Sequence, residues 1–383
     1  MNVRLAVAGG CAAGLASGWN ISNMGAVAQQ LASSYGVGLA TVGLFTTALF
    51  VTHLLLQVPA GRASDRHGER LVALLGLTLI VCFNALALIG PYAALAIVAR
   101  VLVGVGTGLA FVSGSAYVRV QGGSPFAQGL FGGVALAGGG LALAIVPPIE
   151  DAIGWRAPFV TAIAVGAAGL VLLAVAPSDA PRSQATRPAT GGPTGVFRER
   201  RLYRLAVVYA ASLGLSIVVG NWVVTLLHRN GDLSTSGAGL VGALTLVLGV
   251  ATRPLGGWLL DERPRWVRAA VAGSLVAGAL GTVALAVSKP VGLAVLGAAL
   301  IGLAAGIPFA PSFTGAALTR PDAPAAAVGF VNGAAAFVTL VGTPLVGLTF
   351  SAPGNGRLGF ALVAAGWLVA LALLPSARRL GVR

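Results

Sequence analysis

Long runs of apolar residues, separated by short polar stretches, make up most of the chain. A helix that crosses a lipid bilayer needs about 20 mostly apolar residues, and twelve runs meet this requirement. Their approximate bounds are 5–30, 38–60, 71–90, 92–118, 128–148, 157–176, 203–227, 237–260, 267–287, 291–318, 325–350 and 357–376. The pattern therefore predicts an all-α membrane protein with twelve transmembrane helices.

One polar stretch is longer than the others and divides the chain. Residues 177–202 include few apolar residues but several prolines and arginines, a composition typical of a flexible linker. Six apolar runs precede this stretch and six follow it. We predict an N-terminal six-helix bundle over residues 1–176, a linker over residues 177–202 and a C-terminal six-helix bundle over residues 203–383.

The two predicted bundles carry similar residues at equivalent places, as the repeats of transporters do. The first run contains Gly18, Trp19 and Asn20, and the seventh contains Gly220, Asn221 and Trp222. Gln57, Gly61 and Asp65 lie at and just after the end of the second run, and Arg253, Gly257 and Asp261 lie at the end of the eighth at the same spacing. This match indicates two pseudo-symmetric halves in which Gln57 corresponds to Arg253.

Composition excludes a soluble protein. Only 9% of the residues are charged and 57% are hydrophobic, whereas about 25% of the residues of a soluble domain are charged. The 56 glycines allow close packing between membrane helices. The net charge of +14 does not indicate a nucleic-acid partner, because the basic residues lie in short loops rather than on one polar face.

Basic residues are distributed unevenly between the two ends of the predicted helices. Of the 24 Lys and Arg residues, two lie within helices, and a cytoplasmic N-terminus places eighteen of the others in the cytoplasm. The opposite side receives only Arg156, Arg229, Lys289 and Arg357. Cytoplasmic loops are enriched in Lys and Arg. We therefore predict a multi-pass protein of the plasma or inner membrane with both termini and the linker in the cytoplasm.

The residues that usually form catalytic or metal centres are scattered. Cys11 and Cys82 both lie within apolar runs, and the three histidines are far apart in the chain. This arrangement provides no disulfide or metal-binding pattern and no clustered nucleophile and base. We predict no enzyme activity, no catalytic residue, no metal and no cofactor.

Charge inside the predicted helices is exclusively positive. Arg100 and Arg253 lie within apolar runs, whereas all ten acidic residues lie in loops or at helix ends. Ionisable residues in a membrane are costly and usually functional. A central cavity with two arginines and no carboxylate favours an anionic substrate over a cationic one.

The loop after the second run resembles the signature of the major facilitator superfamily. It carries Gly61, Asp65, Arg66, Gly68 and Arg70 at the expected places, and departs from the pattern at Glu69, where a small or basic residue is commoner. The resemblance implies that this loop is a charged lock which closes and opens the cytoplasmic side, with Asp261 as its counterpart in the second half.

Two further motifs and one subfamily feature extend this resemblance over the whole chain. Residues 100–108 and 154–159 are typical of the superfamily, which implies a secondary active transporter with alternating access. Residues 253–261 are similar to those of nitrate/nitrite porters, in which one arginine from each half clamps the anion. Here Gln57 replaces the first arginine, and residues 138–140 are all glycine where that family prefers Gly-Asn-x-Gly.

Polar side chains within the apolar runs are the candidates for substrate binding. They are Arg253, Gln57, His53, Asn20, Asn23, Asn221, Trp222 and Arg100. Arg253 could clamp an anion or belong to the loop lock, and Arg100 could contact substrate or pair with backbone carbonyls. His53 could carry a proton or be a buried neutral residue. The asparagines could line the cavity or join helices.

These residues favour a secondary active transporter of a small anion, either nitrate/nitrite-like or a carboxylate. The alternative is an efflux porter for neutral or amphipathic compounds. The predicted partners are the small-molecule substrate, a coupling proton or counter-anion and the lipid bilayer, with no nucleic acid, and the chain is expected to be a monomer. A channel would need a selectivity filter or an oligomeric pore, which the duplicated plan does not require. Pro308, Pro311 and Pro344 are candidate helix kinks.

Overall fold

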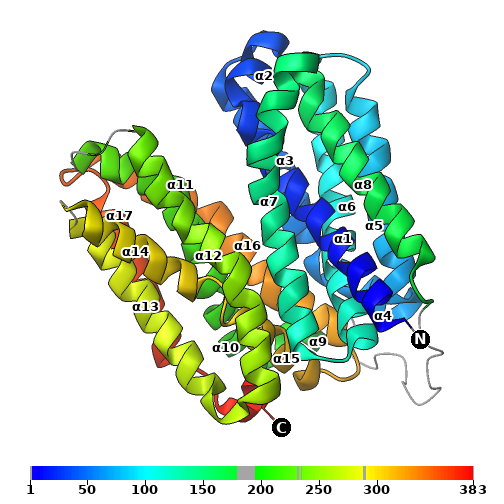
Figure 1. Cartoon of the computed structure of the whole chain (residues 1–383), viewed down its shortest axis with the longest axis vertical. Coiled ribbons are helices and arrows are strands. Elements are labelled where there is room, and N and C mark those ends of the chain that lie inside the picture. The colour runs from blue at the N-terminus through cyan, green and yellow to red at the C-terminus, as the bar shows by residue number, and fades with distance from the viewer. Residues whose placement is uncertain (1, 179–194, 231–232, 234, 288–289, 383) are drawn as a thin grey trace. The chain divides into compact units, whose positions relative to one another are not determined.

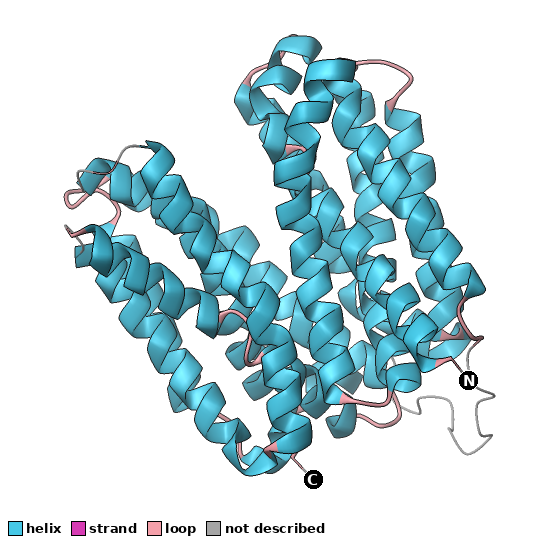
Figure 2. Cartoon of the chain, viewed as in Figure 1, coloured by secondary structure: helices cyan, strands magenta, loops and turns pink. Residues whose placement is uncertain are grey.

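The computed structural model describes residues 2–178, 195–230, 233, 235–287 and 290–382, and every regular element in these residues is helical (Figure 2). Eight of the described helices are long and apolar enough to cross a membrane, and a bent pair makes a ninth. All twelve apolar runs contain helix. The longest continuous span, Pro125–Val175, joins the fifth and sixth predicted runs. The all-α membrane fold is therefore confirmed.

The described residues group into two compact units. Unit 1 is drawn from Met1–Gly123, Val134–Thr190 and Asp322–Gly329, and unit 2 from Ser124–Gly133, Gly191–Pro321 and Phe330–Arg383. Two helices thus contribute to both units, each through its first residues. This grouping does not test the predicted division into two bundles at residues 177–202, which remains a prediction.

Unit 1 is built mainly from the first eight α-helices of the chain (Figure 1). Their bounds are α1 Val3–Ser22, α2 Ala28–Tyr35, α3 Leu39–Leu55, α4 Gln57–His67, α5 Glu69–Ala87, α6 Ala93–Gly122, α7 Pro125–Ile153 and α8 Ala157–Val175. Helices α1, α5, α6 and α8 pack against one another, and α3 packs on α6. Small residues permit this packing: Gly76 of α5 lies against the backbone of α6 at Gly106 and Ala110.

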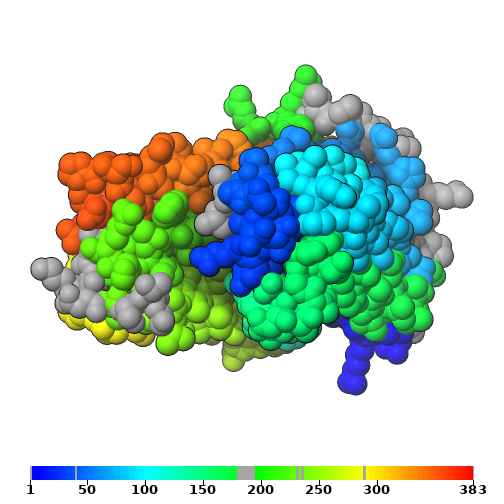
Figure 3. All heavy atoms as spheres, turned by 90° about the horizontal axis from the view of Figure 1, so that it is seen from above, coloured from blue at the N-terminus to red at the C-terminus, as the bar shows by residue number. Residues whose placement is uncertain are grey.

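A cluster of aromatic residues lies at the end of unit 1 that contains α2. Tyr35 of the short helix α2 contacts Phe45 and Trp155, with ring centroids 5.5 and 5.8 Å apart. Figure 3 shows the blue segment that includes α2 beside the teal-green end of α7. Trp19 and Phe159 belong to the same apolar cluster. The first predicted run is therefore two helices, because the chain turns at Asn23–Val27 so that α2 can cover this end.

Unit 2 contains the remaining helices. Their bounds are α9 Gly195–Arg198, α10 Arg200–Tyr209, α11 Ser216–Asn230, α12 Thr235–Glu262, α13 Val267–Val287, α14 Val291–Ala304, α15 Phe309–Thr319, α16 Pro324–Leu348, α17 Arg357–Ala372 and the 3₁₀ helix η6 Ala377–Leu380. A π-helical segment, Ala210–Leu215, joins α10 to α11. Helix α13 packs against α14 and α17, and α12 packs against α11 and α14.

Two of the predicted helices are interrupted near prolines. The second run is divided at Leu56, and its two parts are bent by 49°. Pro59 lacks the N–H that would donate to the carbonyl of Leu55, and its ring crowds that carbonyl. The tenth run is divided between Ala304 and Phe309, with Pro308 at the N-cap of α15. By contrast, Pro344 lies inside α16, which continues past it.

Candidate functional site

Arg253 on α12 is the best candidate for direct contact with an anion. Its side chain is only 2% exposed. One terminal nitrogen, Nη1, donates a hydrogen bond to the carbonyl of Gly132 at 2.6 Å, and the guanidinium lies 4.8 Å from the ring centroid of Phe309. In the described part of the chain, Nε and Nη2 have no hydrogen-bond partner. These two N–H groups form one edge of the planar fork that binds carboxylates in a bidentate manner.

Two buried hydroxyl groups in unit 2 also lack a hydrogen-bond partner among the described residues. The Tyr209 hydroxyl, at the C-terminal end of α10, and the Ser312 hydroxyl, on α15, have no partner among the described residues. Tyr209 is close enough to Arg253 to interact with it electrostatically, and its ring contacts Phe309 and Phe313. Buried polar atoms without partners are rare, and each costs about 1–3 kcal/mol. Unit 2 therefore holds a cationic, aromatic site with unused donors.

The local backbone around Tyr209 explains how this residue is positioned. The π-helical segment begins directly after it, at Ala210, and such bulges are frequent at functional sites. Within the segment, the Ser212 hydroxyl donates to the carbonyl of Ala304 at 2.7 Å, where α14 ends. The bulge of one helix thus satisfies the broken end of another and keeps Tyr209 against α15.

At the equivalent place in unit 1, the polar side chains hydrogen-bond to one another or to nearby backbone carbonyls. Gln57 is buried, and its amide Nε2 donates to the carbonyl of His53 at 3.0 Å. Nδ1 of His53 lies 3.0 Å from the hydroxyl of Thr107, which itself donates to the carbonyl of Gly104. Because the single hydroxyl hydrogen is committed to Gly104, Nδ1 of His53 carries the hydrogen and donates to Thr107. Phe50 and Phe111 face the imidazole edge-on.

Arg100 lies in a network of backbone carbonyls in unit 1. It is fully buried, Nη2 donates to the carbonyl of Asn20 at 2.5 Å, and Nε donates to the carbonyl of Phe45 at 3.3 Å. The Asn20 side chain donates to the carbonyl of Ala16 and accepts a hydrogen bond from Asn84. Sequence reasoning missed Asn84, although a lone polar residue in an apolar run is the same signal that identified Asn20.

The remaining sequence-predicted binding residues join helices elsewhere. Asn23 donates to the carbonyl of Pro158 at 2.9 Å, which ties the end of α1 to the start of α8. Asn221 and Trp222 donate to the hydroxyl and the carbonyl of Thr343, at 3.0 and 2.8 Å, which ties α11 to α16. None of these hydrogen bonds involves Arg253.

Asp65 lies at the N-terminus of α16 within unit 1. Its two carboxylate oxygens accept hydrogen bonds from the backbone N–H groups of Ala325 and Ala326, each at 3.0 Å. A helix N-terminus attracts negative charge and has unpaired N–H groups. A Cβ on Gly61 would collide with the backbone of Ala325 and Ala326. Glycine at position 61 therefore allows α4 to approach α16 closely enough for this cap.

Asp261 makes the corresponding contact within unit 2. It accepts a hydrogen bond from the backbone N–H of Phe126 at 2.8 Å, at the start of α7. A Cβ on Gly257 would collide with the carbonyl of Pro125. The spacing shared by the two halves in the sequence thus corresponds to the same interaction in each unit.

The other residues of the predicted lock differ in their contacts. Arg70 donates through Nε to the carbonyl of Leu173 at 3.0 Å and through Nη2 to that of Ala174, at the C-terminal end of α8 where positive charge is favourable. Gly68 has a φ of 108°, which favours glycine. Arg66 is exposed. Arg119, in the last turn of α6, interacts electrostatically with Asp65.

Comparisons with solved structures show which fold this arrangement belongs to. The E. coli fucose:proton symporter FucP has a TM-score of 0.74 and 16% identity, with 99% of each chain covered. The human organic anion transporter MFSD10 has a TM-score of 0.73 and 18% identity over 98% of this chain and 100% of that chain. The proton:xylose symporter XylE has a TM-score of 0.74 and 14% identity over 97% and 94%.

These structures share the fold at low sequence identity. No curated protein sequence matches the chain significantly. The sequence model of the Major Facilitator Superfamily, in contrast, matches residues 10–343. That match covers the motif of residues 61–70, which the structure places in α4 and α5 with only Gly68 between them rather than in a loop, together with the motif in α6 and both candidate regions described above. The chain is a multi-pass membrane transporter, not an enzyme, and belongs to the major facilitator superfamily.

Proposed function

We propose that this protein is a secondary active transporter of a small anion and that Arg253 binds the anion directly. The observation that carries the proposal is the free Nε–Nη2 edge of a buried guanidinium. A buried charge without a full set of partners is strongly unfavourable. An anion that accepts both hydrogen bonds would neutralise the charge and pair both donors. The hydroxyl group of Tyr209, which is close enough to Arg253 to interact with it, would supply a further donor.

The surroundings favour a carboxylate over nitrate or nitrite. In unit 1, the position equivalent to Arg253 is Gln57, whose amide already donates to the carbonyl of His53. A two-arginine clamp for a bare inorganic anion is therefore incomplete. Phe309 and Phe313 pack against each other in a tilted arrangement, with centroids 4.3 Å apart, Phe309 lies against Arg253, and aromatic rings of this kind bind the apolar part of an organic ion. An aromatic or branched monocarboxylate fits these features.

Alternating access would open this site first to one side of the membrane and then to the other. The cap of Asp65 on α16 consists of two hydrogen bonds and that of Asp261 on α7 of one, which a conformational change can break and remake. We propose that both contacts hold one end of the transporter closed. His53, bonded to Thr107, is the proposed place for a coupling proton.

Thermal unfolding of the purified protein tests the anion site first. We expect benzoate to raise the unfolding temperature more than nitrate does, and glucose to have no effect, because ligands that bind only the folded state stabilise it. Arg253→Gln should weaken benzoate binding by about 10- to 100-fold, the value of one strong charge-assisted pair. Arg253→Lys, which keeps the charge but loses the fork, should retain part of the affinity.

Arg263→Gln is the matched control, because it removes one exposed arginine just beyond α12. It should leave benzoate binding unchanged. Wild-type affinity in Arg253→Gln would refute the direct role of Arg253. Stabilisation only by neutral or cationic amphipaths would replace the anion proposal by an efflux porter.

A further inference from the structure

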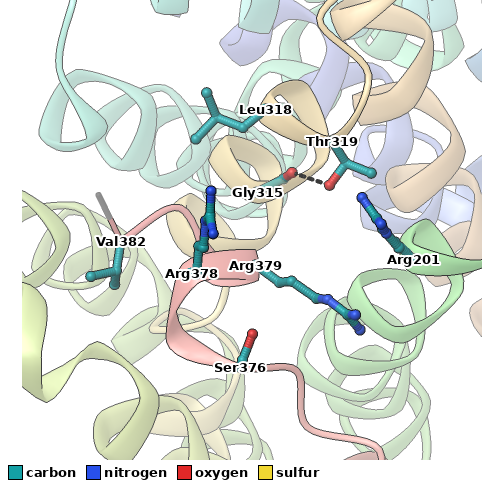
Figure 4. A pocket seen from close by; sticks show the side chains of 8 residues that line it. All are labelled: Arg201, Gly315, Leu318, Thr319, Ser376, Arg378, Arg379 and Val382. Carbon is teal, nitrogen blue, oxygen red and sulfur yellow. Dashed lines mark hydrogen bonds between the residues drawn. The ribbon is translucent and has the colours of Figure 1, made fainter.

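A second cationic pocket lies within unit 2, away from Arg253. It has a volume of about 1220 Å³ and lies between α10, the end of α15 and η6. The lining residues that carry the argument are Arg201, Thr319, Ser376, Arg378 and Arg379. Figure 4 shows the guanidinium groups of Arg201 and Arg379 extending from different elements into the same space, with Arg378 on the opposite side.

The pocket wall is held together by close packing rather than by its charged side chains. A Cβ on Gly315 of α15 would collide with the carbonyl of Arg379, so η6 lies directly against α15. The carbonyl of Ser376 accepts the backbone N–H groups of Arg379 and Leu380, at 3.0 and 3.2 Å. The backbone of η6 therefore presents its two arginines from a fixed position.

The arginines of this pocket have little compensating charge. In the described part of the chain, neither Arg378 nor Arg379 has a side-chain hydrogen bond or salt bridge. Arg201 has one carboxylate nearby, with Nε 4.0 Å from Oε1 of Glu199, but its side chain is 67% exposed. An exposed pair of this kind contributes little. Three guanidinium groups around one space repel each other unless an anion lies between them.

We propose that this pocket binds a phosphate group, carried by the headgroup of an anionic phospholipid. A phosphate has several oxygens and can accept from more than one guanidinium at once. The Ser376 hydroxyl has no partner in the described residues and can donate to the same group. The Thr319 hydroxyl donates to the carbonyl of Gly315 at 2.7 Å, so its hydrogen is not available to the phosphate.

The position of the pocket along the helix favours a lipid as the source of the phosphate. It lies at the last residues of the candidate membrane span Val291–Thr319, where the hydrocarbon region meets water. Leu318 lines the pocket and is 44% exposed, so acyl chains could continue along the same helix. Arginines next to a membrane attract anionic lipids.

Native mass spectrometry of the full chain in detergent tests this proposal. The probes are phosphatidylglycerol, phosphatidylcholine and inorganic phosphate. We expect one phosphatidylglycerol molecule to be retained preferentially over phosphatidylcholine. Arg378→Gln combined with Arg379→Gln should weaken its binding at least tenfold. The control, Arg200→Gln with Arg263→Gln, removes the same two charges from exposed positions outside the pocket and should keep the lipid.

A second variant covers the case in which the double variant does not fold. Leu318→Glu places a carboxylate beside the arginines at an exposed position, and it should displace phosphatidylglycerol while leaving the unfolding temperature nearly unchanged. If inorganic phosphate binds alone with the same dependence on the arginines, the phosphate site holds but its ligand is soluble. Equal lipid retention in the pocket variants and the control would overturn the proposal.

Discussion

At the scale of single residues, the buried polar groups differ in how completely they are paired. Gln57, Arg100 and Arg253 all produce the same signal in the sequence, a polar side chain in an apolar run. Gln57 donates to the carbonyl of His53, Arg100 donates to two carbonyls and keeps Nη1 without a partner in the described residues, and Arg253 donates to one carbonyl and keeps Nε and Nη2 free. Only Arg253 thus leaves two N–H groups of one guanidinium edge free for the same anion.

The Asn20–Asn84 pair leads to a prediction about stability. Asn84→Leu keeps a similar volume but removes the donor to Asn20 Oδ1, which lies 3.0 Å away in the buried interior. We expect a loss of about 1–2 kcal/mol in the free energy of unfolding, measured by denaturant unfolding in mild detergent. Thr78→Val on the same helix is the control, because the exposed Thr78 bonds only to its own helix.

A double-mutant cycle distinguishes this hydrogen bond from simple packing. If the bond matters, Asn20→Leu and Asn84→Leu together should cost less than the sum of the two single changes. Strictly additive losses would show that the two side chains do not stabilise each other.

At the scale of helices, the sequence predicted positions well and continuity poorly. The apolar runs lie where the helices lie, because each membrane helix satisfies its own backbone hydrogen bonds. The bend of 49° after Leu55 and the π-helical segment at Ala210–Leu215 were not predicted. The bend follows from Pro59, a local signal. The π-helical segment depends on a distant carbonyl, that of Ala304.

The close approach of α4 to α16 can be tested at Gly61. Gly61→Val would push its side chain into the backbone of Ala325 and Ala326, at a cost of about 1–3 kcal/mol. A cysteine at position 325, in a chain without Cys11 and Cys82, should then react about tenfold faster with a water-soluble maleimide. Ala325 is fully buried when Gly61 is present.

Gly43→Val is the control for this experiment. Gly43 is also helical and belongs to unit 1, but an added Cβ there meets nothing within 4 Å. In the Gly43→Val variant, the cysteine at position 325 should react with the maleimide at the same rate as in the parent chain. An unchanged rate in Gly61→Val would mean that the two helices do not need this glycine to stay together.

At the scale of the whole molecule, family membership and the multi-pass fold follow from different observations. The sequence model matches residues 10–343, and the solved transporters share the fold at 14–18% identity. We propose in addition that the protein lies in the plasma or inner membrane as a monomer, with both termini in the cytoplasm. The uneven distribution of arginines supports this orientation.

Reporter fusions test the proposed orientation. Alkaline phosphatase, which is active only outside the cytoplasm, should be inactive when fused within residues 177–202 and active when fused after Asn230. A fluorescent protein that folds in the cytoplasm should show the opposite pattern. The reverse result at both places would overturn the orientation.

The sequence by itself determined that the chain is a multi-pass membrane protein and a member of its superfamily. These properties depend on hydropathy and on motifs such as the spacing of Gly61 and Asp65, which are local. Only the tertiary structure decided which polar atoms have partners. Those partners, such as Gly132 for Arg253 and Ala325 for Asp65, come from residues more than a hundred positions away, so no local pattern specifies them.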